Sequence, residues 1–287
     1  MSVWYPDFYP AFRCRAAACR HSCCRGWEID VDQDSAELYR QLPGALGEAL
    51  RAALFENEEG WHFRLDGEER CPFLQKDGLC RLIRELGEEA LCDVCALHPR
   101  FFQEIGEDEL WGLGLSCEAS TALLLERETL RFVCRETGEE TDFPGLLERL
   151  GIAVPGELLR FAPRIDEARR QELLRRFRAT EPIDRAWPRE LEALEASPLP
   201  ETVDAARYQR IYEYLFFRQI EKLEDEGAER VAAYAGDMTD LLALWDARVP
   251  DTAGHLRRLS EQIEYSTENV ERLIQFGIRS SEFGIEG

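Results

Sequence analysis

The stretch Cys14-Arg-Ala-Ala-Ala-Cys19-Arg-His-Ser-Cys23-Cys24 places four cysteines within eleven residues near the start of the chain. Five more follow before residue 120, at positions 71, 80, 92, 95 and 117, and Cys134 is the last. Residues 135–287 contain no cysteine. This gradient predicts that the first part of the chain gathers its thiols around one feature, and that the rest is a helical body attached to it.

Three explanations fit such a set of cysteines: a metal or iron–sulfur site, a framework of disulfides, or ordinary buried thiols. The N-terminus lacks the basic segment and apolar core of a secretory signal, and no apolar run of about 18 residues is present to span a membrane. We therefore expect a cytoplasmic protein with no membrane partner. Disulfides are rare in the cytosol, where clustered cysteines more often bind metal or carry out redox chemistry, so a metal site is the preferred interpretation.

Thiolates suit zinc, or iron in a sulfide cluster, because soft sulfur donates well to both metals. Zinc takes four ligands, and a 4Fe–4S cluster takes four cysteines. Nine cysteines within 104 residues exceed one such site. The pattern fits either two sites or one site with some cysteines outside it. His21 and His98 lie beside cysteines and are further candidate ligands or proton carriers.

The formal net charge is −22, and 32% of the residues are charged. A surface this acidic repels phosphate backbones, so nucleic acid is an unfavourable partner, and cationic proteins are favoured instead. Hydrophobic residues make up 45% of the chain, which is typical of a globular protein rather than a disordered one.

Local signals predict a mainly α fold with small β-hairpins. Asp66-Gly67 and Gly106 are the expected hairpin turns, and residues 1–13 are expected to be extended beside the cysteines. Helical periodicity and breakers predict helices at 35–55 (broken near Pro43), 81–91, 120–132, 165–178, 184–196, 203–225, 228–247 and 252–278. The predicted organisation is a cysteine-rich, cluster-binding N-terminal domain at 1–135 and a C-terminal helical bundle at 136–287.

The cysteines stand in an ordered set of short motifs. The sequence resembles the flagellin lysine N-methylase family, and more distantly small cysteine-cluster proteins described as zinc or iron chelators. The resemblance covers roughly residues 5–125. Its motifs are Phe12-Arg-Cys14, Cys19, Cys23-Cys24-Arg-Gly-Trp27-Glu-Ile29-Asp-Val-Asp32, Cys71-Pro72-Phe73-Leu74, Cys80, Cys95-Ala-Leu-His-Pro99-Arg100 and Leu115-Ser116-Cys117.

The resemblance implies a protein lysine N-methyltransferase that uses S-adenosylmethionine, carries an iron–sulfur cluster and acts on a flagellin-like, lysine-bearing protein. A 4Fe–4S cluster is the expected form, with zinc as the alternative. Arg100 could bind the carboxylate of the methyl donor, since an arginine fork suits carboxylates. Cys92 and Cys134 fall outside the family pattern. The implied metal ligands are Cys14, Cys19, Cys23, Cys24, Cys71, Cys80, Cys95 and Cys117.

Two departures from the family pattern bear on activity. After Cys117 the family has Pro-Glu-Ala-Ala-Arg, whereas this chain has Glu-Ala-Ser-Thr-Ala and so lacks the arginine at 122. Family members are also commonly longer. A non-catalytic zinc- or iron-chelating protein, or a redox iron–sulfur protein, is therefore the alternative function.

The catalytic residues are not identified by the sequence. The chain lacks the Gly-x-Gly-x-x-Gly turn of nucleotide-binding folds, so the methyl donor is expected outside such a site, against the cluster. Glu28, Asp30 and Asp32 follow the first cysteines and are candidates to recruit the acceptor lysine. The same three carboxylates also fit a solvated strand edge.

Overall fold

The computed structural model describes residues 1–277 and divides into two compact units. The first, here called the cysteine unit, comprises Arg13–Arg100. The second, here called the helical unit, comprises Met1–Phe12 and the chain from Phe101 onward. Eight of the ten cysteines lie in the cysteine unit, and Cys117 and Cys134 lie in the helical unit.

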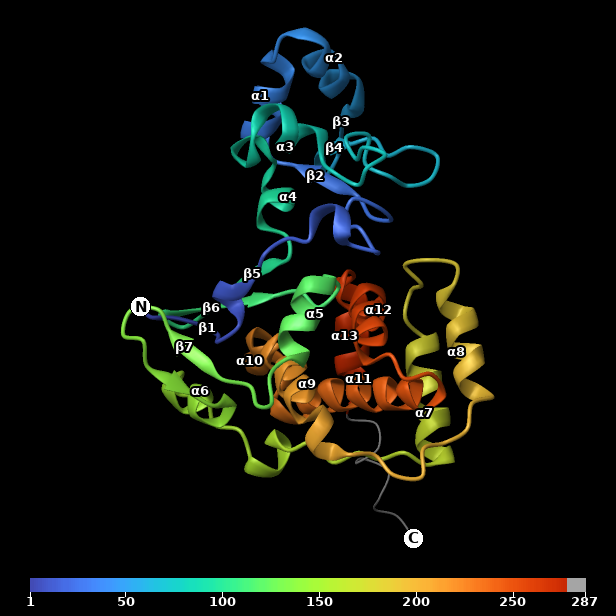
Figure 1. Ribbon diagram of the computed structural model, residues 1–287. Helices are drawn as coiled ribbons and strands as arrows, with labels where there is room; N and C mark the ends of the chain where they lie inside the picture. The colour runs from blue at the N-terminus through green and yellow to red at the C-terminus, as the bar shows by residue number, and fades with distance from the viewer. Residues whose placement is uncertain (278–287) are drawn as a thin grey trace. The chain divides into compact units, whose positions relative to one another are not determined.

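The cysteine unit combines a three-stranded antiparallel sheet, in the order β2-β4-β3, with four short helices (Figure 1). Its core includes Tyr39, Phe63 and Phe73, and the ring of Phe63 contacts the rings of both other residues. The elements are β2 (Ile29–Val31), α1 (Gln33–Gln41), α2 (Gly44–Ala53), β3 (Leu54–Asn57), β4 (Gly60–Phe63), α3 (Arg81–Leu86) and α4 (Asp93–Leu97).

The predicted helix at 35–55 forms as two helices, and the predicted break near Pro43 is confirmed. Asp32 caps α1, because its side chain accepts a hydrogen bond from the Ser35 N–H at 2.8 Å. Pro43 precedes α2, and Gly44 opens it with a φ of 76°, a backbone conformation that favours glycine. The two helices can therefore turn back on one another and share one core.

The predicted hairpin at Asp66-Gly67 is wrong. β4 pairs with β3 across a turn at residues 58–59, where the Asn57 side chain accepts hydrogen bonds from the Glu59 and Gly60 N–H groups. Asp66 instead organises a loop: its carboxylate accepts from the backbone N–H groups of Glu68 and Arg70 at 2.9 and 3.0 Å. An Asp-Gly pair favours a turn, but does not by itself specify the strands that the turn joins.

The helical unit contains a five-stranded sheet in the order β5-β6-β1-β7-β8. The predicted hairpin at Gly106 is confirmed, since β5 and β6 are neighbours and Gly106 lies between them with a φ of 61°. β1 pairs in parallel with β6 and antiparallel with β7. The strands are β1 (Val3–Pro6), β5 (Arg100–Ile105), β6 (Asp108–Leu113), β7 (Phe132–Cys134) and β8 (Glu140–Thr141).

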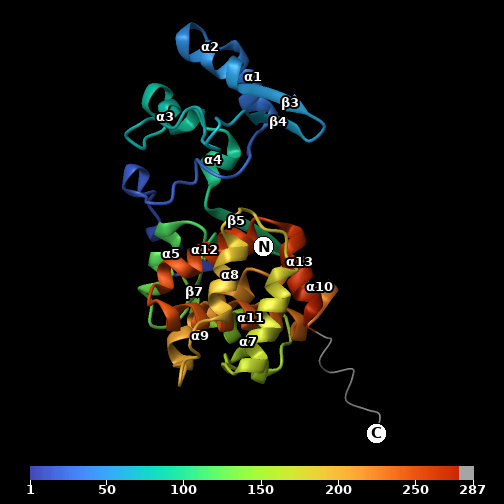
Figure 2. The same ribbon diagram turned by 90° about the vertical axis from the view of Figure 1, so that its right-hand side faces the viewer.

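Helices make up the rest of this unit, and α11 is its longest element (Figure 1). α11 packs against α7, α8, α9, α12 and α13, and Figure 2 shows α7 and α8 side by side. The helices are α5 (Glu118–Leu125), α6 (Phe143–Arg149), α7 (Glu167–Arg178), α8 (Trp187–Glu195), α9 (Ala205–Phe217), α10 (Leu223–Glu226), α11 (Ala228–Arg248), α12 (Thr252–Glu264) and α13 (Thr267–Phe276).

Most predicted helices of this unit are confirmed, with shorter or divided spans. α7, α8 and α11 match the predictions at 165–178, 184–196 and 228–247. The prediction at 252–278 divides at Ser266, whose side chain caps α13; residue 278 lies outside the described residues. Within residues 1–277, no helix has the length and apolar composition to cross a membrane. The mainly α fold class with small sheets is thus confirmed.

The division of the chain differs from the predicted boundary at 135/136. The sequence predicts residues 1–13 beside the cysteines, but β1 lies inside the five-stranded sheet, and Trp4 and Phe8 are buried in the core of the helical unit. Residues 101–135 join the same unit through β5, β6, α5 and β7. Strand pairing between distant segments therefore sets the domain boundary, and local composition does not reveal it.

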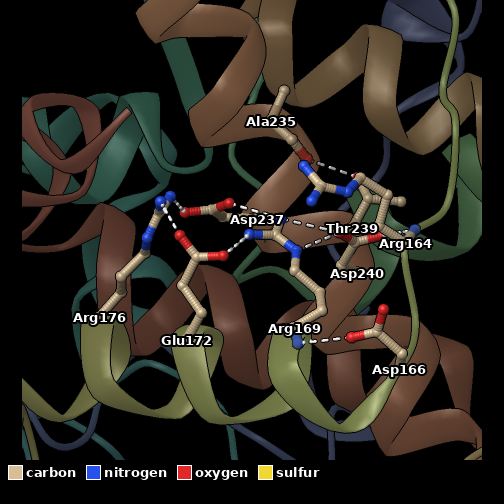
Figure 3. Close-up of polar contacts among 9 residues, drawn as sticks. All are labelled: Arg164, Asp166, Arg169, Glu172, Arg176, Ala235, Asp237, Thr239 and Asp240. Carbon is tan, nitrogen blue, oxygen red and sulfur yellow. Dashed lines mark hydrogen bonds and ion pairs between the residues drawn. The ribbon is translucent and has the colours of Figure 1, made fainter. Parts of the chain in front are cut away.

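A buried network of charges joins α7 to α11 (Figure 3). Arg169 binds Asp237 at 2.7 Å and Asp240 at 2.8 Å, and Arg176 binds Asp237 at 2.5 Å. Glu172 lies between the two arginines on α7 and pairs with both. Asp237 and Asp240 are 1% and 2% exposed. Burial raises the pKa of Asp240 to about 6, against the lowering effect of Arg169. Each carboxylate therefore depends on its arginine partner.

We predict that Arg169→Met destabilises the helical unit by about 3–5 kcal/mol, the usual effect of removing one partner from a buried ion pair. The variant leaves the buried Asp240 carboxylate without its arginine partner. The pKa of Asp240, already raised by burial, should then rise further. Because a raised carboxyl pKa gives stability that is lost as pH rises through it, the deficit should be larger at pH 8 than at pH 5. Urea unfolding followed by circular dichroism at both pH values measures this.

Arg178→Met is the matched control, since Arg178 pairs with Glu195 and both side chains are about 40% exposed. Surface pairs contribute roughly 0–1 kcal/mol, so this variant should unfold like the unmodified protein. Equal losses in the two variants would contradict the account of the network. A loss in the Arg169→Met variant that does not depend on pH would contradict it as well.

Candidate thiol site and the neighbouring acidic hollow

Five thiols of the cysteine unit lie against one small core and influence one another's ionisation, and Cys23 contacts this set through a hydrogen bond to Cys24. Negative charge on Cys24 raises the pKa values of Cys71, Cys80 and Cys95, and negative charge on Cys92 raises those of Cys80 and Cys95. Cys71 and Cys92 are buried, and the other three are partly buried against the same small core. We call Cys24, Cys71, Cys80, Cys92 and Cys95 the thiol site.

Backbone contacts bring three segments together at this site. The Cys71 N–H donates to the Cys24 carbonyl at 2.9 Å, which joins the first cysteine segment to the 71–80 loop. An isolated β-bridge between Leu74 and Cys80 closes that loop. Cys80 and Cys92 then occupy the N-cap positions of α3 and α4. Each helix start therefore holds a thiol at the site.

Backbone N–H groups near the sulfur atoms favour their ionisation. Those of Phe73 and Leu74 act to lower the pKa of Cys71, and those of Leu82 and Ile83 act to lower the pKa of Cys80. Neither Cys80 nor Cys92 caps its helix through the sulfur, however, and the Cys95 N–H donates to the Cys92 carbonyl at 3.0 Å. Nearby N–H groups of this kind favour negative charge on sulfur, as they do at helix N-termini.

Burial opposes ionisation at the same time. It raises the pKa of Cys71 to about 12 and also raises the pKa of Cys80. The interaction between Cys92 and Cys95 lowers the pKa of Cys92 and raises that of Cys95. A hydrogen bond from Cys23 lowers the pKa of Cys24 to about 7. The protein alone therefore supports only part of the charge that five thiolates would carry.

None of the ten cysteines, all within the described residues, is joined in a disulfide, so the disulfide framework is excluded as an explanation for the cluster in this structure. The donor types fit a soft metal, because five sulfur atoms lie in or against one core. Among residues 1–277, however, no three His, Cys, Asp or Glu side chains stand in an arrangement that could hold a metal ion. The thiol site is therefore a gathered set of donors and not a closed metal centre.

The remaining predicted site residues are less closely gathered. Cys14 is exposed and Cys19 is partly exposed, on either side of a 3-10 turn at Ala16–Ala18. Cys117 lies in the other unit, at the N-cap of α5. Arg100 is the first residue of β5 and the last residue of the cysteine unit, and its side chain is partly exposed.

The two histidines beside cysteines differ in surroundings. His98 stacks near Trp27, with ring centroids 5.8 Å apart, and burial lowers the pKa of His98 to about 4. His98 is therefore a neutral imidazole at pH 7. His21 is exposed in the first cysteine segment.

An acidic hollow of about 670 Å³ adjoins α4 and the sheet of the same unit. Asp30, Asp32, Glu59 and Asp93 contribute carboxylates to its lining, and Trp61 contributes a partly buried ring. Asp93 and Val94, which line the hollow, separate Cys92 from Cys95 in sequence. The hollow and the thiol site are therefore built on the same short helix.

The three carboxylates singled out in the sequence have different roles. Asp32 caps α1 and also accepts from the Asp93 N–H at 2.9 Å; these hydrogen bonds outweigh burial and lower its pKa. Asp30 Oδ1 lies 3.0 Å from Nδ1 of the buried His62, within hydrogen-bond distance. The other ring nitrogen of His62, Nε2, contacts Asn57 Oδ1 at 2.9 Å. Glu28 is exposed and does not line the hollow. Asp32 is structural, and Asp30 is left facing the hollow.

Curated proteins with related sequences carry names that bear on this site. A lysine-N-methylase of Salmonella typhimurium is 29% identical over 131 residues, which are 44% of this chain and 33% of that protein. A lysine-N-methylase of Salmonella choleraesuis is 30% identical over 134 residues, with the same two shares. The flagellar biosynthetic protein FliU of Salmonella muenchen is 29% identical over 131 residues, which are 44% of this chain and 78% of that protein.

The resemblance to lysine-N-methylases that the sequence predicts is confirmed over 44% of this chain. The match spans about a third of the length of the two lysine-N-methylases. No family model matches the chain, and no solved structure matches it.

Cys92 is the member of the thiol site that the family pattern omits. The pattern leaves it out together with Cys134, yet Cys92 is fully buried, occupies the N-cap position of α4 and interacts with Cys95. Its Cys-x-x-Cys spacing from Cys95 is the signal in the sequence that could identify it, since this spacing places two thiols at the start of one helix. Cys134 lies apart, buried in the helical unit.

We predict that Asp32→Ala loosens α4 and exposes Cys92. The variant removes caps from two helices, and each lost cap costs about 1 kcal/mol. Under reducing conditions, a maleimide should label Cys92 and Cys95 faster than in the unmodified protein, with the buried Cys134 as an internal reference; mass spectrometry of peptides measures the rates. Asp34→Ala is the control, because Asp34 is exposed in the first turn of α1. Equal labelling in both variants would refute the double capping role.

Proposed function

We propose that this chain is a protein lysine N-methyltransferase that uses S-adenosylmethionine and acts on a flagellin-like protein. The observation that carries the proposal is the gathered thiol site beside an acidic hollow, in a relative of proteins named lysine-N-methylase. A flagellar partner is suggested by the name of the third relative. The acceptor and the donor are both part of the proposal.

Cys24, Cys71, Cys80, Cys92 and Cys95 would hold a metal cofactor; their number is enough for either a 4Fe–4S cluster or one zinc ion, and the cluster is the form that the family resemblance implies. Sites that are incomplete without metal often close on binding, and the thiols lose their protons as they do so. A cluster held by only three of these cysteines would keep one iron without a thiolate, and this iron would be available to the amino-carboxylate of the donor. Cys14, Cys19, Cys23 and Cys117 remain candidate ligands from the family pattern, and Arg100 a candidate for the donor carboxylate.

Methyl transfer needs a neutral lysine amine aligned with the methyl sulfonium. The lysine ammonium first loses a proton; its nitrogen then forms a bond to the methyl carbon as the carbon–sulfur bond breaks, and the sulfur leaves with the electron pair as S-adenosylhomocysteine. The acidic hollow would hold the ammonium through Asp30, Glu59 and Asp93. Asp30 would receive the proton, and His62 Nδ1, 3.0 Å from its Oδ1, would hold the carboxylate in place.

The decisive experiment starts from protein purified without oxygen. We expect iron and sulfide, with absorbance near 400 nm, roughly where thiolate-ligated clusters absorb. Calorimetry should show S-adenosylmethionine binding, and mass spectrometry should show a gain of one methyl group per turnover on a flagellin lysine. Asp30→Asn should lower kcat about 100-fold or more, in the range of general-base losses, and retain donor binding. Donor binding that is absent with a full complement of cluster would reject the proposal.

We predict that Cys92→Ala loses iron as fully as Cys71→Ala. Both remove a buried thiol from the thiol site, whereas Cys134→Ala, a buried thiol of the helical unit, should keep its iron. Iron analysis and visible absorbance of the three variants, with folding checked by circular dichroism, measure this. If the Cys92→Ala variant keeps its iron, Cys92 is not a ligand, and the ligands are to be sought among the cysteines of the family pattern.

The alternative function is a non-catalytic zinc- or iron-chelating or redox protein. The specific observation in its favour is that the match covers only 33% of the two lysine-N-methylases. A colourless protein with one zinc per chain and no donor binding would support chelation. Reversible bleaching without donor binding would support a redox role.

A further inference from the structure

A groove of about 320 Å³ on the helical unit has apolar walls and is separate in sequence from the cysteine unit. Ile105, Ile152, Val154 and Leu223 line it, and all four are partly buried and packed against the main core. The end of the edge strand β5, the loop after α6, the 3-10 turn Ile220–Lys222 and α10 contribute its walls. The groove is therefore supported by the folded core and not by one loop.

Three exposed glutamates, Glu104, Glu221 and Glu224, rim this groove. Among the residues that the structure describes, none of their carboxylates takes part in a side-chain hydrogen bond or ion pair. The basic residues nearby in sequence are engaged elsewhere: Lys222 pairs with Glu271 at 3.6 Å, and Arg230 pairs with Glu226 at 2.6 Å. The rim thus carries about three negative charges that the described side chains do not neutralise.

We propose that this groove docks a lysine side chain of the acceptor protein, with its methylenes along the apolar walls and its ammonium at the glutamate rim. Lysine combines an apolar four-carbon stem with a compact charge, which is the pairing that this lining complements. The chain's net charge of −22 favours encounter with such a cationic segment. This proposal rests on the proposed function only for the identity of the partner. The lysine that binds in the groove is a docking residue of the acceptor protein and is not the lysine that is methylated.

The test uses a fluorescent nine-residue peptide with a central Leu-Lys-Leu between Gly-Ser flanks, and a matched peptide with norleucine in place of lysine. The full-length protein should bind the lysine peptide about tenfold more tightly than the norleucine peptide at low salt, since only the charge differs. The triple variant Glu104→Gln, Glu221→Gln, Glu224→Gln should bind both peptides equally. Fluorescence anisotropy measures the affinities, and circular dichroism confirms folding.

The control triple variant is Glu128→Gln, Glu148→Gln, Glu192→Gln, which makes the same charge change at exposed positions of the same unit outside the groove. It should keep the preference for lysine. Equal losses in the two triple variants would show a general effect of net charge and overturn the groove as a site. Amide hydrogen exchange should slow at residues 104–106, 152–154 and 220–224 on peptide binding; protection elsewhere would also overturn it.

The binding test needs neither methyl donor nor cluster, so it separates the two proposals. A protein that binds the lysine peptide in the groove but never methylates would retain the docking site and lose the proposed function. A protein that methylates with the same KM for its acceptor in the groove variant as in the control variant would retain the function and lose the docking site. With both correct, the groove variant should raise KM about tenfold and leave kcat unchanged.

Discussion

The burial of five thiols in one small core is the constraint on which the cysteine unit depends. Residues 13–100 form a domain of modest size, in which every core position matters because a small domain buries a small fraction of its surface. Cys71 and Cys92 are buried among apolar side chains of this core. Burial opposes their ionisation, whereas backbone N–H groups near the sulfurs favour it. The ionisation of the thiols is therefore set by the fold of the unit.

Much of the secondary structure could be predicted from local sequence, because caps and breakers act over a few residues. Aspartates cap α1, α6, α7, α9 and α12, each accepting a backbone hydrogen bond within the first turn. The division into units could not be predicted in this way. It depends on β1 pairing with β6 and β7 more than 100 residues along the chain, and no local pattern specifies those partners.

The sequence predicts that thiols gather in the first part of the chain, but not which of them meet, and soft-metal chemistry stays a prediction. Which thiols meet depends on the contact between Cys24 and Cys71 and on the start of α4. Cys92 joins the site for that reason, although the family pattern omits it, and Cys117 belongs to the other unit. The acidic residues divide similarly: Asp237 and Asp240 are buried in ion pairs, whereas Glu104 and Glu221 remain at the surface. The composition of the chain does not distinguish the buried carboxylates from the exposed ones.

The extent of the sequence match bears on the choice between enzyme and chelator. The match takes in 44% of this chain, whereas the cysteine unit has 88 residues (100 − 13 + 1), which are about 31% of 287. The similarity must therefore continue into the helical unit. A module that only chelates metal would need the cysteine unit alone, since all five members of the thiol site lie within it. Shared sequence beyond that unit is therefore not accounted for by the thiol site alone.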